Sequence, residues 1–486
     1  ESAPGDCLYG NGPGGFRSFV PWAAGFSAFA WEGYGLTTMI APVASWNNYP
    51  RQVCTLHRPE RYREFSPDVE SAIARGLGRS YGDAALNEGG HVFLSERLNR
   101  ISVFDPERGV LRAEAGVSLD DLLRVIVPRG WFLPVTPGTR FVSLGGAVAS
   151  DVHGKNHHCD GSFGNYVNSI QLAIPGAGTI DCSPTANPET FWATVGGMGL
   201  TGFIGEVELQ LHPISSAYVQ ARHYAATNLE ELFRHFSDPD RDAPYTVAWI
   251  DCLSAGKRLG RGVLMAGHHA ARDELPTEAR AKPYDLSTGR ALSVPVNLPA
   301  WVLNPTCVSL FNGAYFAAQA RKRAPFIADY LSFFYPLDNI SHWNRMYGTR
   351  GFVQYQCVIP EAGAFDAMRK LLERIASSRH ASFLAVLKRM GPAGNGMLSF
   401  PMPGYTLALD LSLRDPDLFK LLDALDELVI QHGGRVYLAK DARLSAASFR
   451  RMYPRYEEWL TVKNKLDPQH RITSSLARRL EIGGAA

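Results

Sequence analysis

The stretch ARGLGRSYGDAALNEGG, from Ala74 to Gly90, combines five glycines in seventeen residues with side chains that can bind an anion. Glycines let backbone N–H groups turn toward one ligand and approach it closely. Arg79 could add a positive charge, and Ser80 a hydroxyl donor. These features predict a cradle for phosphate, although the same glycines also suit an ordinary loop.

The segment is not the dinucleotide-binding fingerprint G-x-G-x-x-G. The third glycine of GLGRSYG (76–82) is displaced, and the residues that follow do not begin a helix with an apolar face. Two further glycine-rich segments, 134–165 and 191–211, accompany expected strands. Three segments whose backbone can approach a ligand closely favour a binding site for a large polyanionic cofactor over an ordinary loop.

The segment HGKNHH (153–158) raises a metal site as an alternative. Its glycine does not suit a helix, Lys155 would repel a cation, and Asp151 and Asp160 are the nearby carboxylates. Polar residues beside an organic cofactor explain the same segment. We therefore expect no bound metal.

The composition is that of a globular chain long enough for two domains, with 486 residues, 45% apolar and 20% charged. The 49 basic and 47 acidic residues include no long basic run, which argues against a nucleic-acid partner. Seven scattered cysteines without C-x-x-C pairs predict free thiols. The aromatic segment 16–35 is broken by proline, glycine and glutamate, so we expect a covering strap or a surface-seeking arm.

Short apolar or alternating runs at 91–98, 101–105 and 110–116 predict strands. Ser118 can cap a helix that ends near Pro128. The apolar face of this helix would consist of Leu119, Leu122, Leu123 and Ile126. Such alternation predicts an α+β fold without a regular doubly wound repeat.

The pattern changes near residues 213–217, where we expect a domain boundary. Helices are predicted at 228–236 and 364–378, and strands within 381–391 and 404–413. The second helix shows an apolar stripe of Phe365, Met368, Leu371, Leu372 and Ile375. These elements predict an open antiparallel sheet with helices on one face.

Five motifs together resemble the flavin-dependent oxidases of the vanillyl-alcohol-oxidase superfamily: ARGLGRSYGD, PGTRFVSLGGAVASDVHGKNHH, GSFGN, FWATVGGMGLTG and YLAKDAR. Within it they are most similar to the family of decaprenylphosphoryl-β-D-ribose 2-oxidases, the flavin subunits of the corresponding 2-epimerases. The resemblance implies an α+β fold with a two-subdomain PCMH-type FAD-binding domain and an α+β substrate domain with an antiparallel sheet. The implied parts are an N-terminal extension (1–44), the FAD-binding domain (45–215), the substrate domain (216–433) and a C-terminal return to the FAD-binding domain (434–486).

The resemblance also implies a reaction. The family oxidises the 2-hydroxyl of a polyprenyl-phosphate-linked pentose to a ketone and gives the hydride to flavin N5. A separate NADH-dependent short-chain reductase completes the epimerisation to the arabinose donor of cell-wall arabinan. The family works at the inner membrane, so a peripheral membrane contact is implied while the face of the membrane stays open. Arg79 stands where covalent relatives carry a flavin-linking histidine, which predicts non-covalent FAD.

Residue by residue, the resemblance assigns the cofactor site to Ala74, Arg75, Gly76, Leu77, Gly78, Arg79, Ser80, Tyr81, Gly82, Asp83, Ala84, Gly138, Ser143, Leu144, Gly145, Gly146, His153, Ile204 and Tyr437. It assigns the substrate pocket to His153, Trp249, Tyr335, Gln354, Gln356, Lys388, Thr406, Ala408 and Lys440. Lys440 and Tyr81 are the implied catalytic residues, and Lys388 suits the substrate phosphate. Thr406 and Ala408 depart from the asparagine and cysteine of the mycobacterial proteins, which leaves the substrate less certain than the chemistry.

Two other functions stay open at this point. An aldonolactone or sugar-alcohol oxidase would share the fold, act on a small soluble substrate and be reoxidised by oxygen. A non-catalytic flavin-binding protein belongs to a different class, and the presence of Lys440, Tyr81 and Lys388 counts against it.

Overall fold

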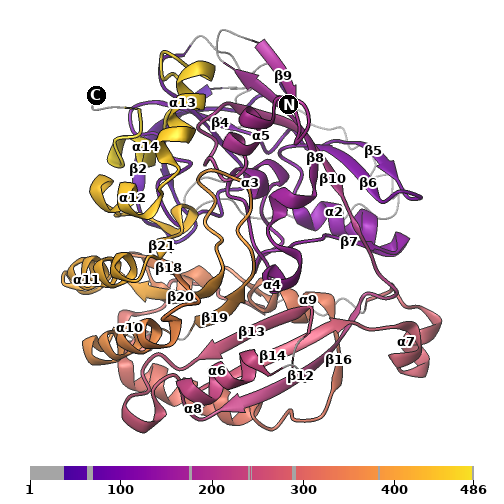
Figure 1. Cartoon of the computed structure of the whole chain (residues 1–486), viewed down its shortest axis with the longest axis vertical. Helices are drawn as coiled ribbons and strands as arrows, with labels where there is room; N and C mark the ends of the chain where they lie inside the picture. The colour runs from indigo at the N-terminus through magenta and orange to yellow at the C-terminus, as the bar shows by residue number, and fades with distance from the viewer. Residues whose placement is uncertain are drawn as a thin grey trace, which may run out of the picture.

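A computed structural model describes residues 38–62, 69–174, 178–238, 241, 243–286, 292–380, 382 and 384–483. The aromatic segment 16–35, and with it most of the predicted extension 1–44, lies outside these residues. Figure 1 shows an upper part, built from the early strands and the last helices, above a lower part built on one large sheet. The chain has an α+β fold.

The upper part contains two sheets. The first has the order β1-β2-β4-β3, with β1 (Thr38–Ala44), β2 (Arg51–His57), β4 (His91–Leu94) and β3 (Ala72–Arg75). The second is antiparallel, with β5 (Ile101–Asp105), β6 (Val110–Glu114), β10 (Phe203–Gln210), β8 (Val167–Ile174) and β9 (Gly178–Cys182) in that order. Because β3 ends at Arg75, the first glycine-rich segment leaves directly from the end of a strand.

The lower part is an eight-stranded antiparallel sheet. Its order is β16 (Phe326–Asp329), β12 (Tyr218–Ala226), β14 (Gly262–His269), β13 (Tyr245–Ile250), β19 (Ala385–Met390), β20 (Gly404–Ser412), β18 (Phe352–Pro360) and β21 (Arg435–Val436). The chain thus enters this sheet at Tyr218, shortly after the expected change at 213–217.

Side chains alternate between the two faces of this sheet. Leu387, Leu407 and Cys357 are buried in a core that also contains residues of three helices. These helices are α6 (Leu229–Ser237), α10 (Ala364–Ser378) and α11 (Leu418–Gln431). The opposite face is therefore left to meet the upper part of the molecule.

The two best-defined sequence predictions concern helices. The Ser118 hydroxyl accepts a hydrogen bond from the Asp121 amide at 3.0 Å and caps α2 (Leu119–Ile126), whose predicted apolar face is fully buried. Helix α10 has the predicted bounds, but the predicted stripe is wrong at Phe365, which is 38% exposed. Ala364 and Ala367 complete the buried face, so the stripe is centred away from Phe365, which packs edge-on against Phe233 of α6.

The other elements connect these layers. They are α3 (Leu144–Ala149), α4 (His157–Asp160), α5 (Pro188–Thr194), α7 (Thr277–Ala281), α8 (Pro305–Gln319), α9 (Tyr330–Phe334) and the short strands β7 (Trp131–Phe132), β11 (His212–Pro213), β15 (Leu292–Ser293) and β17 (Ile340–Ser341). Among the described residues, no helix has the length and apolar character needed to cross a membrane.

The chain returns to the upper part through α12 (Ala446–Met452), α13 (Tyr456–Leu466) and α14 (Ser475–Arg479), which lie beside β2 in Figure 1. Arg479 of α14 forms ion pairs with Asp83 at 2.7 Å and with Asp441 at 2.8 Å. It therefore joins the end of the first glycine-rich loop to the loop that follows β21.

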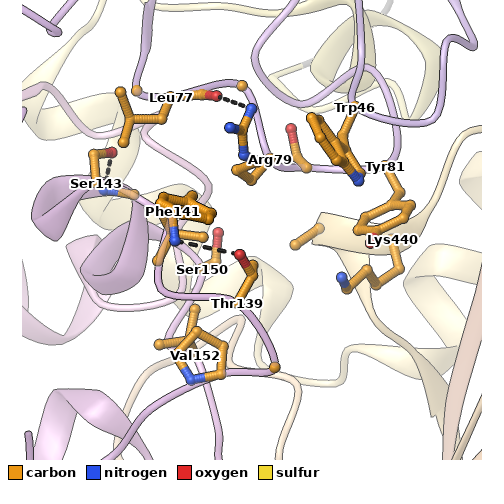
Figure 2. A pocket seen from close by; sticks show the side chains of 18 of the residues that line it. Trp46, Leu77, Arg79, Tyr81, Thr139, Phe141, Ser143, Ser150, Val152 and Lys440 are labelled. Carbon is orange, nitrogen blue, oxygen red and sulfur yellow. Dashed lines mark hydrogen bonds between the residues drawn. The ribbon is translucent and has the colours of Figure 1, made fainter. Parts of the chain in front are cut away.

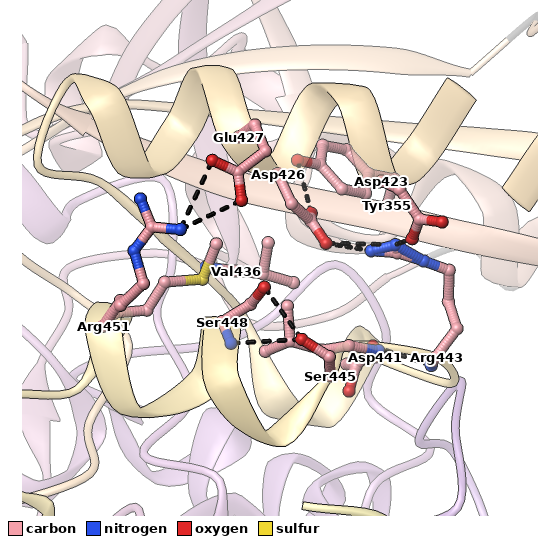
Figure 3. A network of polar contacts seen from close by, with 12 residues as sticks. Tyr355, Asp423, Asp426, Glu427, Val436, Asp441, Arg443, Ser445, Ser448 and Arg451 are labelled. Atoms are coloured by element: carbon pink, nitrogen blue, oxygen red, sulfur yellow. Dashed lines mark hydrogen bonds and ion pairs between the residues drawn. The ribbon is translucent and has the colours of Figure 1, made fainter. Parts of the chain in front are cut away.

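Polar contacts also fix the loop after β21 from its other side (Figure 3). The carboxylate of Asp441 accepts hydrogen bonds from the amides of Arg443 and Leu444 at 2.9 and 2.8 Å. The Arg443 guanidinium pairs with Asp426 of α11, which also accepts a hydrogen bond from the Tyr355 hydroxyl at 3.1 Å. Lys440 thus sits on a loop held by two sets of ion pairs.

Candidate active site

A cavity of about 630 Å³ lies between the loops of the upper part and the open face of the eight-stranded sheet. Figure 2 shows side chains from the upper loops and from the loop after β21 converging on it, with Arg79 and Trp46 near Tyr81 and Lys440. The walls differ in kind. The upper wall consists mainly of loop backbone, and the lower wall of polar side chains.

Glycines allow the loops of the upper wall to pack on one another. A Cβ at Gly76 would overlap the Ser143 hydroxyl, and one at Gly82 would overlap the carbonyl oxygen of Asp441. Gly138 differs, because a Cβ there would have no protein atom within 4 Å, and it lines the cavity. Its missing side chain leaves room for a ligand.

Arg79 extends into the cavity from the first glycine-rich loop (Figure 2). Its guanidinium donates to the carbonyl oxygen of Leu77 at 3.1 Å and lies 4.2 Å from the centre of the Trp46 ring. Desolvation lowers the pKa of Arg79 to about 10, so the group stays charged at neutral pH. Within the described part of the chain it forms no ion pair, and it can therefore serve an anionic ligand.

Lys440 enters from the loop after β21 and lies under Tyr81, with its Nζ 3.8 Å from the centre of the ring. Desolvation lowers the pKa of Lys440 to about 7; the Asp410 carboxylate opposes this shift and Lys388 adds to it. Burial raises the pKa of Tyr81 well above its ordinary value, so the phenol stays protonated. Of these two groups, Lys440 is the one that can change protonation near neutral pH.

Asp410 is fully buried on β20 and faces the same region. Its carboxylate accepts a hydrogen bond from the Gln354 amide at 2.5 Å. Burial raises the pKa of Asp410 to about 7, while Gln354, Lys440 and Tyr347 oppose the shift. Asp410 and Lys440 titrate in the same range and interact, so they form one coupled acid–base pair.

His153 provides a neutral polar group at the centre of the cavity. The Gln356 amide donates to its Nε2 at 2.9 Å and to the Thr406 hydroxyl at 3.1 Å. Burial, with Lys388 and other cations nearby, lowers the pKa of His153 well below its ordinary value. The ring proton therefore belongs on Nδ1, a buried atom with no hydrogen-bond partner among the described residues.

One lysine adds positive charge to the lower wall, and a second lies behind it. Lys388 of β19 lines the cavity, and desolvation lowers its pKa to about 8. Lys155 does not line the cavity; it donates to the carbonyl oxygen of Phe333 and lies 4.3 Å from the centre of that ring. Desolvation and the neighbouring Lys388 lower the pKa of Lys155 to about 7. Lys388 is therefore the lysine of the lower wall that can meet an anionic ligand.

Most residues assigned from the sequence line the cavity. They are Ala74, Gly76, Leu77, Gly78, Arg79, Ser80, Tyr81, Ala84, Gly138, Ser143, Gly145, Gly146, His153, Ile204, Gln354, Gln356, Lys388, Ala408, Tyr437 and Lys440. The remaining assigned residues are Arg75, Gly82, Asp83, Leu144, Trp249, Tyr335 and Thr406, and they lie behind this lining.

The positions behind the lining have structural partners of their own. Arg75 donates to the carbonyl oxygens of Ala44 and Ala85, and Asp83 pairs with Arg479. Gly82 packs against neighbouring backbone, and Leu144 packs in the apolar core.

The three substrate-pocket positions that do not line the cavity contact other residues instead. Tyr335 is fully buried and shares a hydrogen bond of 2.5 Å with the Thr136 hydroxyl. Thr406 supports Gln356, and Trp249 packs against Tyr315 of α8 at 4.8 Å between ring centres.

Sequence reasoning missed Asp410 and Trp46. An acid in the apolar strand GYTLALDLS was a usable signal, because alternation puts Thr406, Ala408 and Asp410 on one face. Trp46 gave no comparable signal, since its contact with Arg79 depends on the fold. Among the described residues, no cluster of three or more His, Cys, Asp or Glu side chains could hold a metal ion.

Comparison with known proteins agrees with this geometry. The family model described as FAD binding domain matches residues 70–183, and that of D-arabinono-1,4-lactone oxidase matches residues 352–480. Decaprenylphosphoryl-β-D-ribose oxidase of Mycolicibacterium smegmatis is 38% identical over 413 residues, which cover 84% of this chain and 89% of that protein. The chain belongs to this oxidase family.

Two more relatives show how far this similarity extends. An uncharacterized protein of Streptomyces coelicolor is 34% identical over 373 residues, which cover 75% of this chain and 100% of that protein. L-gulonolactone oxidase of Scyliorhinus torazame is 30% identical over 188 residues, or 36% of this chain and 42% of that enzyme. As a member of the decaprenylphosphoryl-ribose oxidase family, the protein is an FAD-dependent oxidoreductase.

The residues of the upper wall fit FAD. Arg79 would supply a cation for the pyrophosphate, and Gly138 leaves open space along the cavity. The free Nδ1–H of His153 can donate to a polar edge of the flavin or of the substrate. Bound FAD supplies the hydride acceptor, and the chain supplies orientation and proton transfer.

Proposed function

We propose that the protein oxidises the 2-hydroxyl of a polyprenyl-phosphate-linked ribose to the 2-keto sugar, with FAD as the hydride acceptor. The observation that carries the proposal is the position of Lys440 against Tyr81, in a cavity that also holds Lys388. One lysine suits the hydroxyl proton and the other suits the phosphate.

In this reaction Lys440 polarises the sugar hydroxyl and accepts its proton. With a pKa of about 7, part of the Lys440 population is neutral at neutral pH and can act as a base. The Asp410 carboxylate stabilises the protonated lysine after transfer, because the opposite charges attract. Tyr81 covers Lys440 and keeps bulk water away from it.

The remaining lower-wall residues position the substrate. Lys388 balances the phosphate charge, while the neutral His153 and Gln356 hydrogen-bond the sugar without adding charge. We assign the cofactor and substrate roles given above to the residues that line the cavity. We also retain the division at 215/216. The return to the FAD-binding domain, predicted to begin at residue 434, begins after β21, because that strand pairs with β18 in the eight-stranded sheet.

A lactone or sugar-alcohol oxidase is the second candidate, favoured by the match of residues 352–480 to the D-arabinono-1,4-lactone oxidase model. An uncharged lactone would leave the charge of Lys388 without a counterpart in the cavity. The phosphate-linked substrate therefore fits better. An NADH-dependent reductase that restores the hydroxyl with inverted configuration and a peripheral membrane contact complete the proposal.

The deciding experiment is anaerobic bleaching of the flavin. Purified protein is mixed without oxygen with polyprenyl-phosphate ribose, with its dephosphorylated analogue, or with simple lactones and polyols. Rapid loss of the oxidised flavin absorbance with the phosphorylated lipid alone is the expected result. Bleaching by lactones, and none by the lipid-linked sugar, would establish the second candidate.

A separate acid-precipitation test concerns the linkage of the flavin. Because Arg79 stands in place of a linking histidine, acid should release all of the flavin into the supernatant. Flavin that stays with the pellet would show a covalent bond.

A further inference from the structure

A small aromatic cluster lies where the upper and lower parts meet, apart from the two larger apolar cores. It consists of the buried rings of Tyr81, Trp343, Tyr347 and Phe352. Tyr347 stacks on Phe352 with ring centres 4.1 Å apart, and Tyr81 meets Phe352 edge-on at 5.7 Å. Packing therefore fixes the ring of Tyr347, while its hydroxyl needs a polar partner.

The register of the eight-stranded sheet brings this ring close to Asp410. Gln354 of β18 lies directly opposite Asp410 of β20, and Phe352 comes two residues before Gln354. Residues two apart in a strand share a face, so Phe352 is a diagonal neighbour of Asp410. Because Tyr347 stacks on Phe352, it reaches the same region of the sheet.

The hydroxyl of Tyr347 meets the carboxylate of Asp410. The Gln354 amide donates to Oδ1 of Asp410, and the buried Oδ2 has no closer partner among the described residues. Burial raises the pKa of Asp410, and a hydrogen bond from the Tyr347 side chain opposes this rise. Burial and the Asp410 charge raise the pKa of Tyr347 well above its ordinary value, so the phenol keeps its proton and is the donor.

The segment that carries Tyr347 is tied to the upper part of the molecule. The Asn344 side-chain amide donates to the carbonyl oxygen of Trp46 at 3.1 Å. The backbone amide of Phe352 donates to the carbonyl oxygen of Asn47 at 3.1 Å. Contacts between the two parts therefore help to hold Tyr347 beside Asp410.

We propose that Tyr347 is a positioning residue of the reaction, whose hydrogen bond keeps Asp410 as a carboxylate facing Lys440. Tyr347 does not line the cavity, so it acts through Asp410 and touches neither substrate nor cofactor. The inference rests on the proposed function, because that function makes Lys440 the proton acceptor. Tyr347 thus completes a chain of three groups, phenol, carboxylate and amine, that runs from the aromatic cluster to the cavity.

Four other ionisable groups face this chain: Tyr81, Cys252, His153 and Lys388. Burial raises the pKa of Cys252 to about 12 and that of Tyr81 well above its ordinary value, so both stay protonated. Burial also keeps His153 neutral. Lys388, with a pKa of about 8, titrates above the pair. Titration near pH 7 therefore reports mainly Asp410 and Lys440.

The test is an infrared titration of the flavin-loaded protein without substrate. The C=O absorbance of protonated Asp410 is assigned by its loss in Asp410→Asn. In the wild type this absorbance should grow as the pH falls through about 7. Tyr347→Phe keeps the ring and removes the donor, so the midpoint should move to higher pH by about one unit.

The rate of flavin reduction gives a second readout, at Lys440. An Asp410 side chain that is neutral near pH 7 no longer stabilises protonated Lys440, so Tyr347→Phe should move the rise of the rate to lower pH. The double variant Asp410→Asn/Tyr347→Phe should match Asp410→Asn alone, because Tyr347 acts only through Asp410.

Tyr405→Phe is the matched control. Tyr405 lies on the same strand as Asp410 but on its opposite face, is 4% exposed and stacks on Phe233 at 4.5 Å between ring centres. Its replacement should leave both titrations at their wild-type positions. Thermal melting of both variants measures any loss of stability, which by itself would not move either titration.

Three results would overturn the proposal: an infrared midpoint in Tyr347→Phe equal to that of the wild type, a rate profile displaced to higher pH, or a double variant shifted further than Asp410→Asn. The infrared titration uses no substrate. It therefore decides the role of Tyr347 even if the lipid-linked sugar fails to bleach the flavin, and the two failures can be told apart.

Discussion

The two walls of the cavity are built from different parts of the chain and use different kinds of groups. The upper wall uses backbone, and glycines at 76, 82 and 138 let it pack tightly or leave space. The lower wall and the loop after β21 use ionisable side chains, among them Lys440, whose pKa is set by desolvation. Cofactor binding should therefore be sensitive to added atoms, and chemistry to altered charge.

The largest expected effect comes from replacing the ionisable side chain of Lys440 with an uncharged one of similar length. Lys440→Met should retain flavin but slow anaerobic flavin reduction by substrate about 10²- to 10⁴-fold, because the proton acceptor is lost. Stopped-flow absorbance measures this rate. The control Lys420→Met, on the exposed side of α11, should react like wild type. A wild-type rate in Lys440→Met would remove Lys440 from its role.

The upper wall should respond to single added methyl groups. Gly82→Ala would force the loop away from Asp441, so it should lower the free energy of unfolding by about 1 to 3 kcal/mol and reduce flavin occupancy. Gly138→Ala should weaken flavin binding while the apoprotein keeps wild-type stability, since that Cβ meets no protein atom.

Thermal melting with and without flavin separates these two effects. Gly313→Ala in α8, which is also in open space, serves as the control; it should leave flavin binding unchanged and, as a change inside a helix, raise the free energy of unfolding by about 0.5 to 1 kcal/mol. An equal loss of apoprotein stability in Gly82→Ala and Gly138→Ala would show that the distinction between packing and ligand space is wrong.

The coupled pair in the lower wall predicts a smaller effect with a definite sign. The rate of flavin reduction should rise with pH through about 7, as Lys440 loses its proton. The Asp410 carboxylate raises the pKa of Lys440, so Asp410→Asn should shift this rise to lower pH. The pH profile of the pre-steady-state rate tests the shift. A rise displaced to higher pH would contradict the pairing.

The smallest effect is expected at Thr406, which supports Gln356 without lining the cavity. Thr406→Asn keeps an acceptor for the Gln356 amide and should change kcat/KM by about threefold or less. Thr406→Val removes the acceptor and should cost about tenfold. If the two variants behave alike, the hydrogen bond to Gln356 does not orient the substrate.

Local patterns predicted the elements whose stability is local. Helix α2 was predictable because the Ser118 cap and the apolar spacing both lie within one short segment. The stripe of α10 failed at Phe365 because residue type alone does not show which side a helix turns to its sheet. Ala364 and Ala367 are buried there although they are small.

The candidate site was predictable where long motifs carry it, as in the loop from Ala74 to Ala84. Asp410 and Trp46 were not predicted because their roles come from contacts between separate segments, such as Gln354 with Asp410 and Trp46 with Arg79. Asp83 shows the opposite case. It stands within a cofactor motif, yet its carboxylate faces Arg479 and the C-terminal helices.

Arg479 has a consequence for how the protein is made. The loop that carries Asp83 is synthesised early, but its partner on α14 emerges from the ribosome almost four hundred residues later. Until α14 docks, the glycine loop and the Lys440 loop are not joined, and transient exposure of such surfaces favours chaperone dependence and aggregation. Flavin loading should therefore be among the last steps of biogenesis.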